Sequence, residues 1–216
     1  MLERMSEFFK KRLEGYDEHM LSGIEGAREF YAYTASLLPV RPGCRVLDLG
    51  CGTGLELEAY FAVNPGARIT GVDLSEAMLG RLAAKFADKA VDLVCASYFD
   101  AEFGSGIFDA AVSVESLHHF EKAKKTALYA RLREALKPEG YFVLTDYFAE
   151  TPELEAEYFR RFASLKAEQG VDDGAFYHFD TPLTAEHETE ALYAAGFSRV
   201  ELKKRWGATC TIAAYR

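Results

Sequence analysis

The sequence predicts an α/β fold with a doubly wound, seven-stranded and mostly parallel sheet. Between residues 44 and 148, short apolar segments alternate with segments of helical period. Strands separated by helices become parallel neighbours, because each connection has to cross over the sheet. The last two strand-like segments, residues 197–206 and 208–216, leave no room for a helix between them, so we expect an antiparallel hairpin there.

The first 40 residues are predicted to form a helical cap. Apolar residues recur at helical intervals from about Leu2 to Leu38, until Pro39 and Pro42 break the pattern. The core follows at residues 41–150. It contains strand-like segments at residues 44–50, 68–75, 91–97, 108–115 and 141–148, helices at residues 55–63, 75–87 and 121–136, and a turn at residues 137–140.

Residues 151–196 are predicted to form lid helices over the core. One helix spans residues 152–170, and a polar linker leads to a second helix from Thr184 to Ala195, which Gly196 ends. The terminal hairpin takes up residues 197–216. We expect all these parts to belong to a single domain covering residues 1–216, since a chain of this length suits one core.

The composition argues against several classes of function. A formal net charge of −9 opposes binding to a phosphate backbone, so a nucleic-acid partner is not expected. The cysteines at positions 44, 51, 95 and 210 lie singly, which favours reduced thiols, and we predict no metal site. No segment has the apolar length of a membrane span or the pattern of a signal peptide. We therefore expect a cytoplasmic monomer or homodimer without a membrane partner.

The central motif is a glycine loop after the first strand-like segment. The run from Val46 to Gly54 reads VLDLGCGTG, in which alternate glycines let the backbone turn sharply and approach a ligand closely. Asp73 lies 19 residues after Gly54, a spacing at which a carboxylate can accept hydrogen bonds from ribose hydroxyls. The GxGxxG pattern of dinucleotide binders fails at Leu55, where a third glycine would be needed. The loop therefore predicts a nucleoside-containing ligand other than a dinucleotide.

The run DLGCGTG, with GVDLSEAML after it, resembles the cofactor signature of the class I S-adenosylmethionine-dependent methyltransferases. FDAAVSVESLHHF resembles the fourth-strand segment of that family, and LREALKPEGYFVLTDY its fifth-strand segment, in the same order. The resemblance spans about residues 16–216. It implies a Rossmann-like methyltransferase fold and S-adenosylmethionine as cofactor, with S-adenosylhomocysteine as product.

The resemblance also implies a set of cofactor-binding residues. Asp48 and the loop of Gly50, Cys51, Gly52 and Gly54 would hold the methionine moiety. Asp73 would bind the ribose hydroxyls, while Leu74 and Met78 would flank the adenine. Ser97 stands where the family commonly has an aspartate near the adenine amino group, and Tyr98 would add its backbone amide. Tyr16 matches a cap tyrosine that closes over the cofactor carboxylate.

Methyl transfer by in-line displacement depends mostly on proximity and alignment, so no nucleophilic side chain is required. A general base is needed only when the acceptor is protonated. His118 and His119 follow the fourth strand, at the sheet edge where ligands bind, and one of them is a candidate base. The alternative is that one imidazole caps the sheet end and the other faces solvent. Glu115 is a further candidate near the methionine amine or the acceptor, and Asp146 and Tyr147 follow the fifth strand.

Aromatic residues in the predicted lid suggest a small organic acceptor, although such a stripe also suits packing of the lid onto the core. They are Tyr158, Phe159, Phe162, Phe176, Tyr177 and Phe179. Three other functions stay open at this point: a transferase acting on a tRNA nucleotide, a module that binds S-adenosylmethionine without catalysis, and an NAD oxidoreductase.

Overall fold

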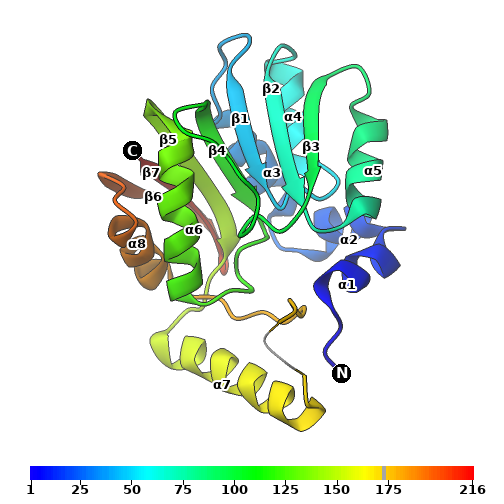
Figure 1. Ribbon diagram of the computed structural model, residues 1–216, viewed down its shortest axis with the longest axis vertical. Coiled ribbons are helices and arrows are strands. Elements are labelled where there is room, and N and C mark those ends of the chain that lie inside the picture. Colours follow the sequence, from blue (N-terminus) through cyan, green and yellow to red (C-terminus); the bar gives the residue numbers. More distant parts are fainter. Residues whose placement is uncertain (172–173) are drawn as a thin grey trace.

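The computed structural model describes residues 1–171 and 174–216 and contains a single seven-stranded sheet in the order β3-β2-β1-β4-β5-β7-β6 (Figure 1). The strands are β1 (Arg45–Leu49), β2 (Arg68–Asp73), β3 (Ala90–Cys95), β4 (Phe108–Val114), β5 (Leu136–Tyr147), β6 (Arg199–Trp206) and β7 (Thr209–Tyr215). Strands β1 to β5 are parallel, and β7 lies antiparallel between β5 and β6. The predicted doubly wound sheet with its antiparallel hairpin is confirmed.

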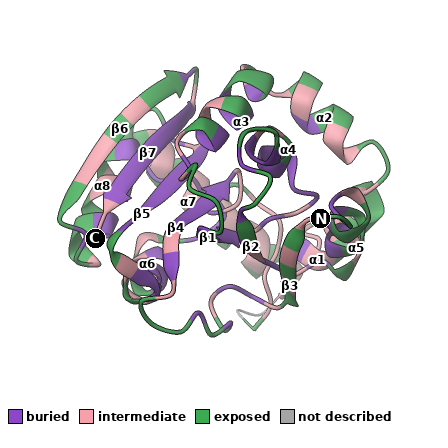
Figure 2. Ribbon diagram, turned by 90° about the horizontal axis from the view of Figure 1, so that it is seen from above, coloured by how far each residue is buried: buried purple, intermediate pink, exposed green. Residues whose placement is uncertain are grey.

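Helices cover both faces of the sheet. They are α1 (Met5–Arg12), α2 (Tyr16–Gly23), α3 (Ala27–Ser36), α4 (Leu55–Val63), α5 (Glu76–Lys85), α6 (Lys122–Ala135), α7 (Pro152–Gln169) and α8 (Ala185–Ala194). Successive residues of β1 point to opposite faces of the sheet: Val46 belongs to the core cluster with α3, α4 and α5, whereas Leu47 belongs to the one with α6 and α8. The central strands are therefore buried on both faces (Figure 2).

The structure differs from two details of the sequence prediction. Helix α8, grouped with the lid, packs against α6 and β6 and so belongs to the helical layer of the core. The predicted turn at residues 137–140 lies within β5, where the pairing with β4 jumps from Leu136 to Tyr141. Helix α7 extends beyond the carboxyl ends of the strands and has no buried residue, so it is the part that fits the term lid (Figure 1).

The N-terminal cap consists of three short helices, and its first segment lies beside residues 176–178 of the α7–α8 connection. The Met5 amide donates to the Phe176 carbonyl at 2.9 Å, and the His178 amide donates to the Glu3 carbonyl at 3.0 Å. The rings of Phe8 and His178 stack 3.5 Å apart. Two segments far apart in the sequence thus close over the same sheet edge.

Within residues 1–171 and 174–216, we find no helix whose length and apolar character would suit a membrane span. The cytoplasmic location and the oligomeric state stay predictions.

Candidate active site

The glycine loop joins the carboxyl end of β1 to α4 in a conformation that favours glycine. Gly50 has φ 72° and Gly52 has φ 47°, both in the left-handed region. A Cβ at Gly50 would lie 1.9 Å from Ser116 Oγ, so no larger residue fits there. A Cβ at Gly52 would meet no described atom within 4 Å, so this part of the loop borders open space. The loop forms a cradle with an open side.

The carboxylate of Asp73, at the end of β2, lies beside this loop. Its Oδ2 accepts a hydrogen bond from the Gly52 amide at 2.9 Å, and its Oδ1 accepts one from the Ser75 amide at 2.8 Å. Burial raises the pKa of Asp73, although these backbone bonds favour the charged form. The acid thus fixes the loop and helix α5 while it borders the cavity described next.

A narrow cavity of about 50 Å³ lies between the glycine loop and the N-terminal cap. Seven of the predicted cofactor residues line it: Tyr16, Gly50, Gly52, Asp73, Leu74, Met78 and Tyr98. Met5 and Phe9 of α1 also line it, and sequence reasoning missed both. The cavity combines a carboxylate, open backbone and apolar side chains, which suits the ribose and base of a nucleoside.

The structure does not place the other four predicted cofactor residues in this lining. Asp48 is buried beneath the loop, where burial and the adjacent Glu56 carboxyl raise its pKa well above the usual value. The Cys51 thiol points toward Gly71 of β2. Gly54 lies against Leu82 and Phe86, where a Cβ would not fit. The Ser97 hydroxyl accepts a hydrogen bond from the Phe99 amide. These four positions support the fold around the cavity.

A second cavity, of about 650 Å³, adjoins the first at the carboxyl ends of β4 and β5. Its walls include the predicted catalytic candidates Glu115, His118 and His119, together with Tyr147. Tyr16, Glu115 and His119 line both cavities, as does Phe9. Sequence reasoning missed His178 and Asp180, which also line this cavity, since neither belongs to a motif and the fold alone brings them there.

His118 is held between two carboxylates. Its Nδ1 lies 2.5 Å from Asp146 Oδ1, and its Nε2 lies 3.5 Å from Asp180 Oδ1. Asp146 is buried and also accepts from the amides of Leu117 at 2.8 Å and Tyr147 at 2.9 Å. Burial opposes a charge on the imidazole, but the two carboxylates outweigh it and raise the pKa of His118 to about 10. Asp146 thus orients the ring toward the cavity.

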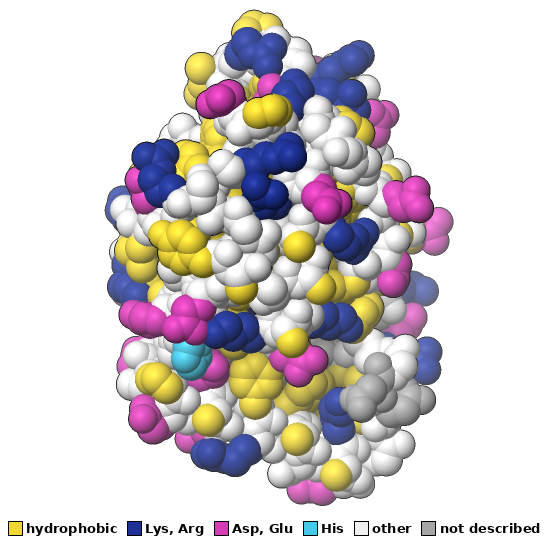
Figure 3. Space-filling view, turned by 60° about the vertical axis from the view of Figure 1, so that its left-hand side comes forward, with side chains coloured by type: hydrophobic (Ala, Val, Ile, Leu, Met, Phe, Trp, Pro, Cys, Tyr) yellow, Lys and Arg dark blue, Asp and Glu magenta, His cyan; other side chains and the backbone are white. Residues whose placement is uncertain are grey.

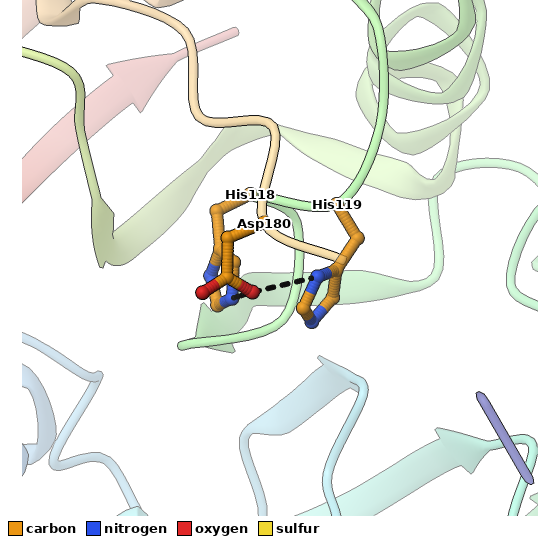
Figure 4. Close-up of side chains that lie close together, drawn as sticks. All are labelled: His118, His119 and Asp180. Carbon is orange, nitrogen blue, oxygen red and sulfur yellow. Dashed lines mark ion pairs between the residues drawn. The ribbon is translucent and has the colours of Figure 1, made fainter. Parts of the chain in front are cut away.

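His119 and Asp180 complete this wall (Figure 4). His119 Nδ1 lies 3.3 Å from Asp180 Oδ1 and 3.1 Å from the Phe179 carbonyl oxygen. Burial and the neighbouring charge of His118 lower the pKa of His119. The two imidazoles lower the pKa of Asp180 despite its partial burial. Two imidazoles and one carboxylate therefore lie close together in the cavity lining.

Glu115 has a strained backbone. Among the residues that the structure describes, it is the only non-glycine residue with positive φ, at 49°. Such a conformation persists where the surroundings impose it, often at functional sites. Its Oε1 accepts a hydrogen bond from Thr209 Oγ1 at 3.1 Å. Burial and the charge of Asp146 raise the pKa of Glu115 to about 7. Glu115 lies at the junction of the two cavities, because it lines both of them.

A third cavity, of about 550 Å³, lies between α7 and the core and includes four of the six predicted lid aromatics: Phe159, Phe162, Phe176 and Tyr177. Phe179 instead stacks on Phe162, and the Tyr158 hydroxyl bonds that of Tyr147 at 2.9 Å. His119 borders this cavity as well. Figure 3 shows hydrophobic side chains reaching the surface in the lower part of the molecule. The lid aromatics therefore surround space next to the site.

Comparison with known sequences identifies relatives of this chain. A family described as a methyltransferase domain matches residues 46–140. The chain is 30% identical over 220 residues to carboxy-S-adenosyl-L-methionine synthase of Wolinella succinogenes, covering 92% of this chain and 88% of that protein. It is also 30% identical over 139 residues to 24-methylenesterol C-methyltransferase 2 of Oryza sativa subsp. japonica, covering 60% of this chain and only 38% of that one.

Solved structures share the fold. An S-adenosylmethionine dependent methyltransferase from Mesorhizobium loti aligns with a TM-score of 0.62 at 22% identity, covering 91% of this chain and 100% of that chain. A DhpI–SAH complex aligns with a TM-score of 0.72 at 18% identity, covering 96% and 93%. Together with the glycine loop, the sheet order and the sequence relatives, these likenesses show that the chain belongs to the class I S-adenosylmethionine-dependent methyltransferases and is an enzyme whose cofactor is S-adenosylmethionine.

Proposed function

We propose that this enzyme methylates a small organic acceptor bound in the 650 Å³ cavity, with S-adenosylmethionine in the narrow cavity beside the glycine loop. One observation carries this proposal: the two cavities share walls formed by Tyr16, Glu115 and His119. A methyl group at this junction would face the acceptor directly. The volume of the larger cavity suits a small-molecule ligand.

The narrow cavity has to widen to admit the cofactor. Its volume of about 50 Å³ is close to that of one or two water molecules. Met5 and Phe9 of α1 and Tyr16 of α2 form its outer wall, and Met5 is the only buried residue of α1. We propose that the N-terminal cap moves outward for binding and closes afterwards, which would exclude water from the junction.

Each side chain receives a proposed role from its position. Asp73 would accept hydrogen bonds from the ribose hydroxyls, and Leu74 and Met78 would contact the adenine. The bound cofactor supplies an electrophilic methyl group on a sulfonium sulfur. Glu115 would take the proton that the acceptor loses, since it borders both cavities. His118 and His119, which line the larger cavity together with Glu115, would hold the acceptor oxygen or nitrogen.

Two measurements test this function. Purified protein should show a higher melting temperature with S-adenosylhomocysteine and no change with NAD, because only a ligand that binds the folded state stabilises it. Incubation with methyl-labelled cofactor and a metabolite extract should then transfer label to a small molecule. Label that stays entirely in the cofactor would support a non-catalytic binding module and contradict the proposal.

Replacing Asp73 with alanine should weaken S-adenosylmethionine binding tenfold or more, about 1.4 kcal/mol, because the ribose loses its acceptor and Gly52 loses its anchor. Titration calorimetry measures the change. Asp92→Ala, at an exposed carboxylate on neighbouring β3, is the matched control and should bind normally. Equal affinities for the two variants would remove Asp73 from the cofactor site.

The relation to the Wolinella succinogenes synthase favours one second candidate, in which the enzyme converts the cofactor itself to a carboxylated form. Mass spectrometry of the cofactor after incubation with the extract distinguishes this reaction from methyl transfer. A tRNA substrate is tested by a gel shift with total tRNA at low salt, where binding should be strong and should fall steeply as salt is added.

A further inference from the structure

We propose that His118, His119 and Asp180 form a site for one divalent transition-metal ion on the wall of the acceptor cavity (Figure 4). This inference rests on the proposed function, because it gives the ion the task of binding an oxygen atom of the acceptor. One potential ligand atom from each of the three residues lies within 4.8 Å of the others. The three side chains come from two segments that lie about 60 residues apart in the sequence.

The distances in this cluster suit a shared cation better than direct hydrogen bonds. Asp180 Oδ1 lies 3.5 Å from His118 Nε2 and 3.3 Å from His119 Nδ1. Typical N–H···O hydrogen bonds measure about 2.7–3.2 Å. Two ligand atoms that are each about 2.1 Å from a metal lie about 3.4 Å apart at the tetrahedral angle. A modest side-chain adjustment would therefore place all three atoms around one ion.

His118 already has the orientation of a metal ligand. Its Nδ1 faces Asp146 at 2.5 Å, which leaves Nε2 directed at the cavity. Histidine ligands commonly donate the second ring N–H to a carboxylate in this manner. Asp146 is itself held by two backbone amides, so the ring has little freedom to turn. His119 would exchange its hydrogen bond to the Phe179 carbonyl for a coordinate bond.

A second group of potential ligands, Glu115, His118 and Asp146, is less suitable. Asp146 is buried and already accepts from His118 and from two amides, so a metal ion there would displace existing bonds. The Asp180 side chain, in contrast, is 48% exposed and borders the cavity. The cavity-facing group is therefore the one that can take up an ion and still leave positions open for a further ligand.

The donor set indicates the class of ion and of acceptor. Two imidazoles and one carboxylate suit zinc, iron, cobalt or nickel, whereas magnesium and calcium prefer oxygen ligands throughout. The open positions face the cavity where we place the acceptor, so they would bind an acceptor with a hydroxyl or phenol oxygen. That oxygen would release its proton to Glu115 on binding. Both imidazoles would then act as ligands, which leaves Glu115 as the base.

Cobalt(II) titration of tag-free, chelator-treated protein tests the site, because coordinated cobalt absorbs visible light. We expect one ion per chain, and Asp180→Asn should weaken binding at least tenfold. His119→Asn should weaken binding similarly, so the test does not depend on a single variant. The melting temperatures of both variants show whether they fold. The control is His187→Asn on α8, a histidine outside the cluster whose Nδ1 lies 2.9 Å from Glu155 Oε1. It should bind cobalt normally.

No saturable cobalt binding by the unaltered protein would overturn the inference, as would equal binding by Asp180→Asn. The result is separable from the proposed function, because binding of S-adenosylhomocysteine and transfer of label to an acceptor are measured independently. Label transfer that persists in fully chelated protein, together with absent cobalt binding, would remove the metal site and leave the methyltransferase assignment intact.

Discussion

Replacement of Glu115 with glutamine is expected to slow methyl transfer by about 10²- to 10⁴-fold, the usual contribution of a general base. Glutamine keeps the size of the side chain and can still bond Thr209, but it cannot take a proton. Cofactor affinity should change much less than the rate, because the variant keeps the shape of the cavity junction. Single-turnover transfer from labelled cofactor to the acceptor found in the extract measures the effect.

Glu139→Gln is the control for this experiment. Glu139 is exposed at the beginning of β5, at the sheet edge opposite the cavities. The same change of charge there should leave the rate unaltered. A Glu115→Gln enzyme that transfers methyl groups at the original rate would show that the acceptor is bound without an ionisable proton or loses it elsewhere.

Removal of the Glu188 side chain should lower the free energy of unfolding by about 3–5 kcal/mol, the usual cost of leaving a buried charge unpaired. Glu188 on α8 lies 2.6 Å from Lys125 Nζ on α6, and the two side chains are 0% and 2% exposed. Tyr129 of α6 also donates to Glu188. Glu188→Ala would therefore leave the buried Lys125 ammonium and the Tyr129 hydroxyl without this partner between the two helices. Urea denaturation measures the loss.

Two further variants give this prediction its control. Glu190 lies on α8, like Glu188, and forms a surface ion pair with Lys122 of α6. Glu190→Ala should therefore lower the free energy of unfolding by only about 0–1 kcal/mol, the usual contribution of an exposed pair. Replacing both Lys125 with methionine and Glu188 with leucine should recover most of the lost stability, because no buried charge is left. If Glu188→Ala unfolded at the same urea concentration as Glu190→Ala, the buried pair would have no role in fixing α8.

Local sequence patterns predicted much of the fold. The periodicity of residues 44–147 and the short connection at Gly207 predicted the parallel strands and the terminal hairpin, because burial on both faces leaves continuous apolar segments. The position of α8 was not predictable from such patterns. Helical period marks a face that is buried, but only the tertiary structure shows that its partner is α6.

For the site, the sequence could predict that the glycine loop, Asp73 and the candidates after β4 lie together beside the cavities, since these residues follow strand ends whose carboxyl termini share one edge of the sheet. The tertiary structure alone decided that Asp48, Cys51, Gly54 and Ser97 face the protein interior or its turns. It also decided that Asp180 meets both histidines, because no motif or spacing encodes a contact made by a loop that returns to the sheet from the lid.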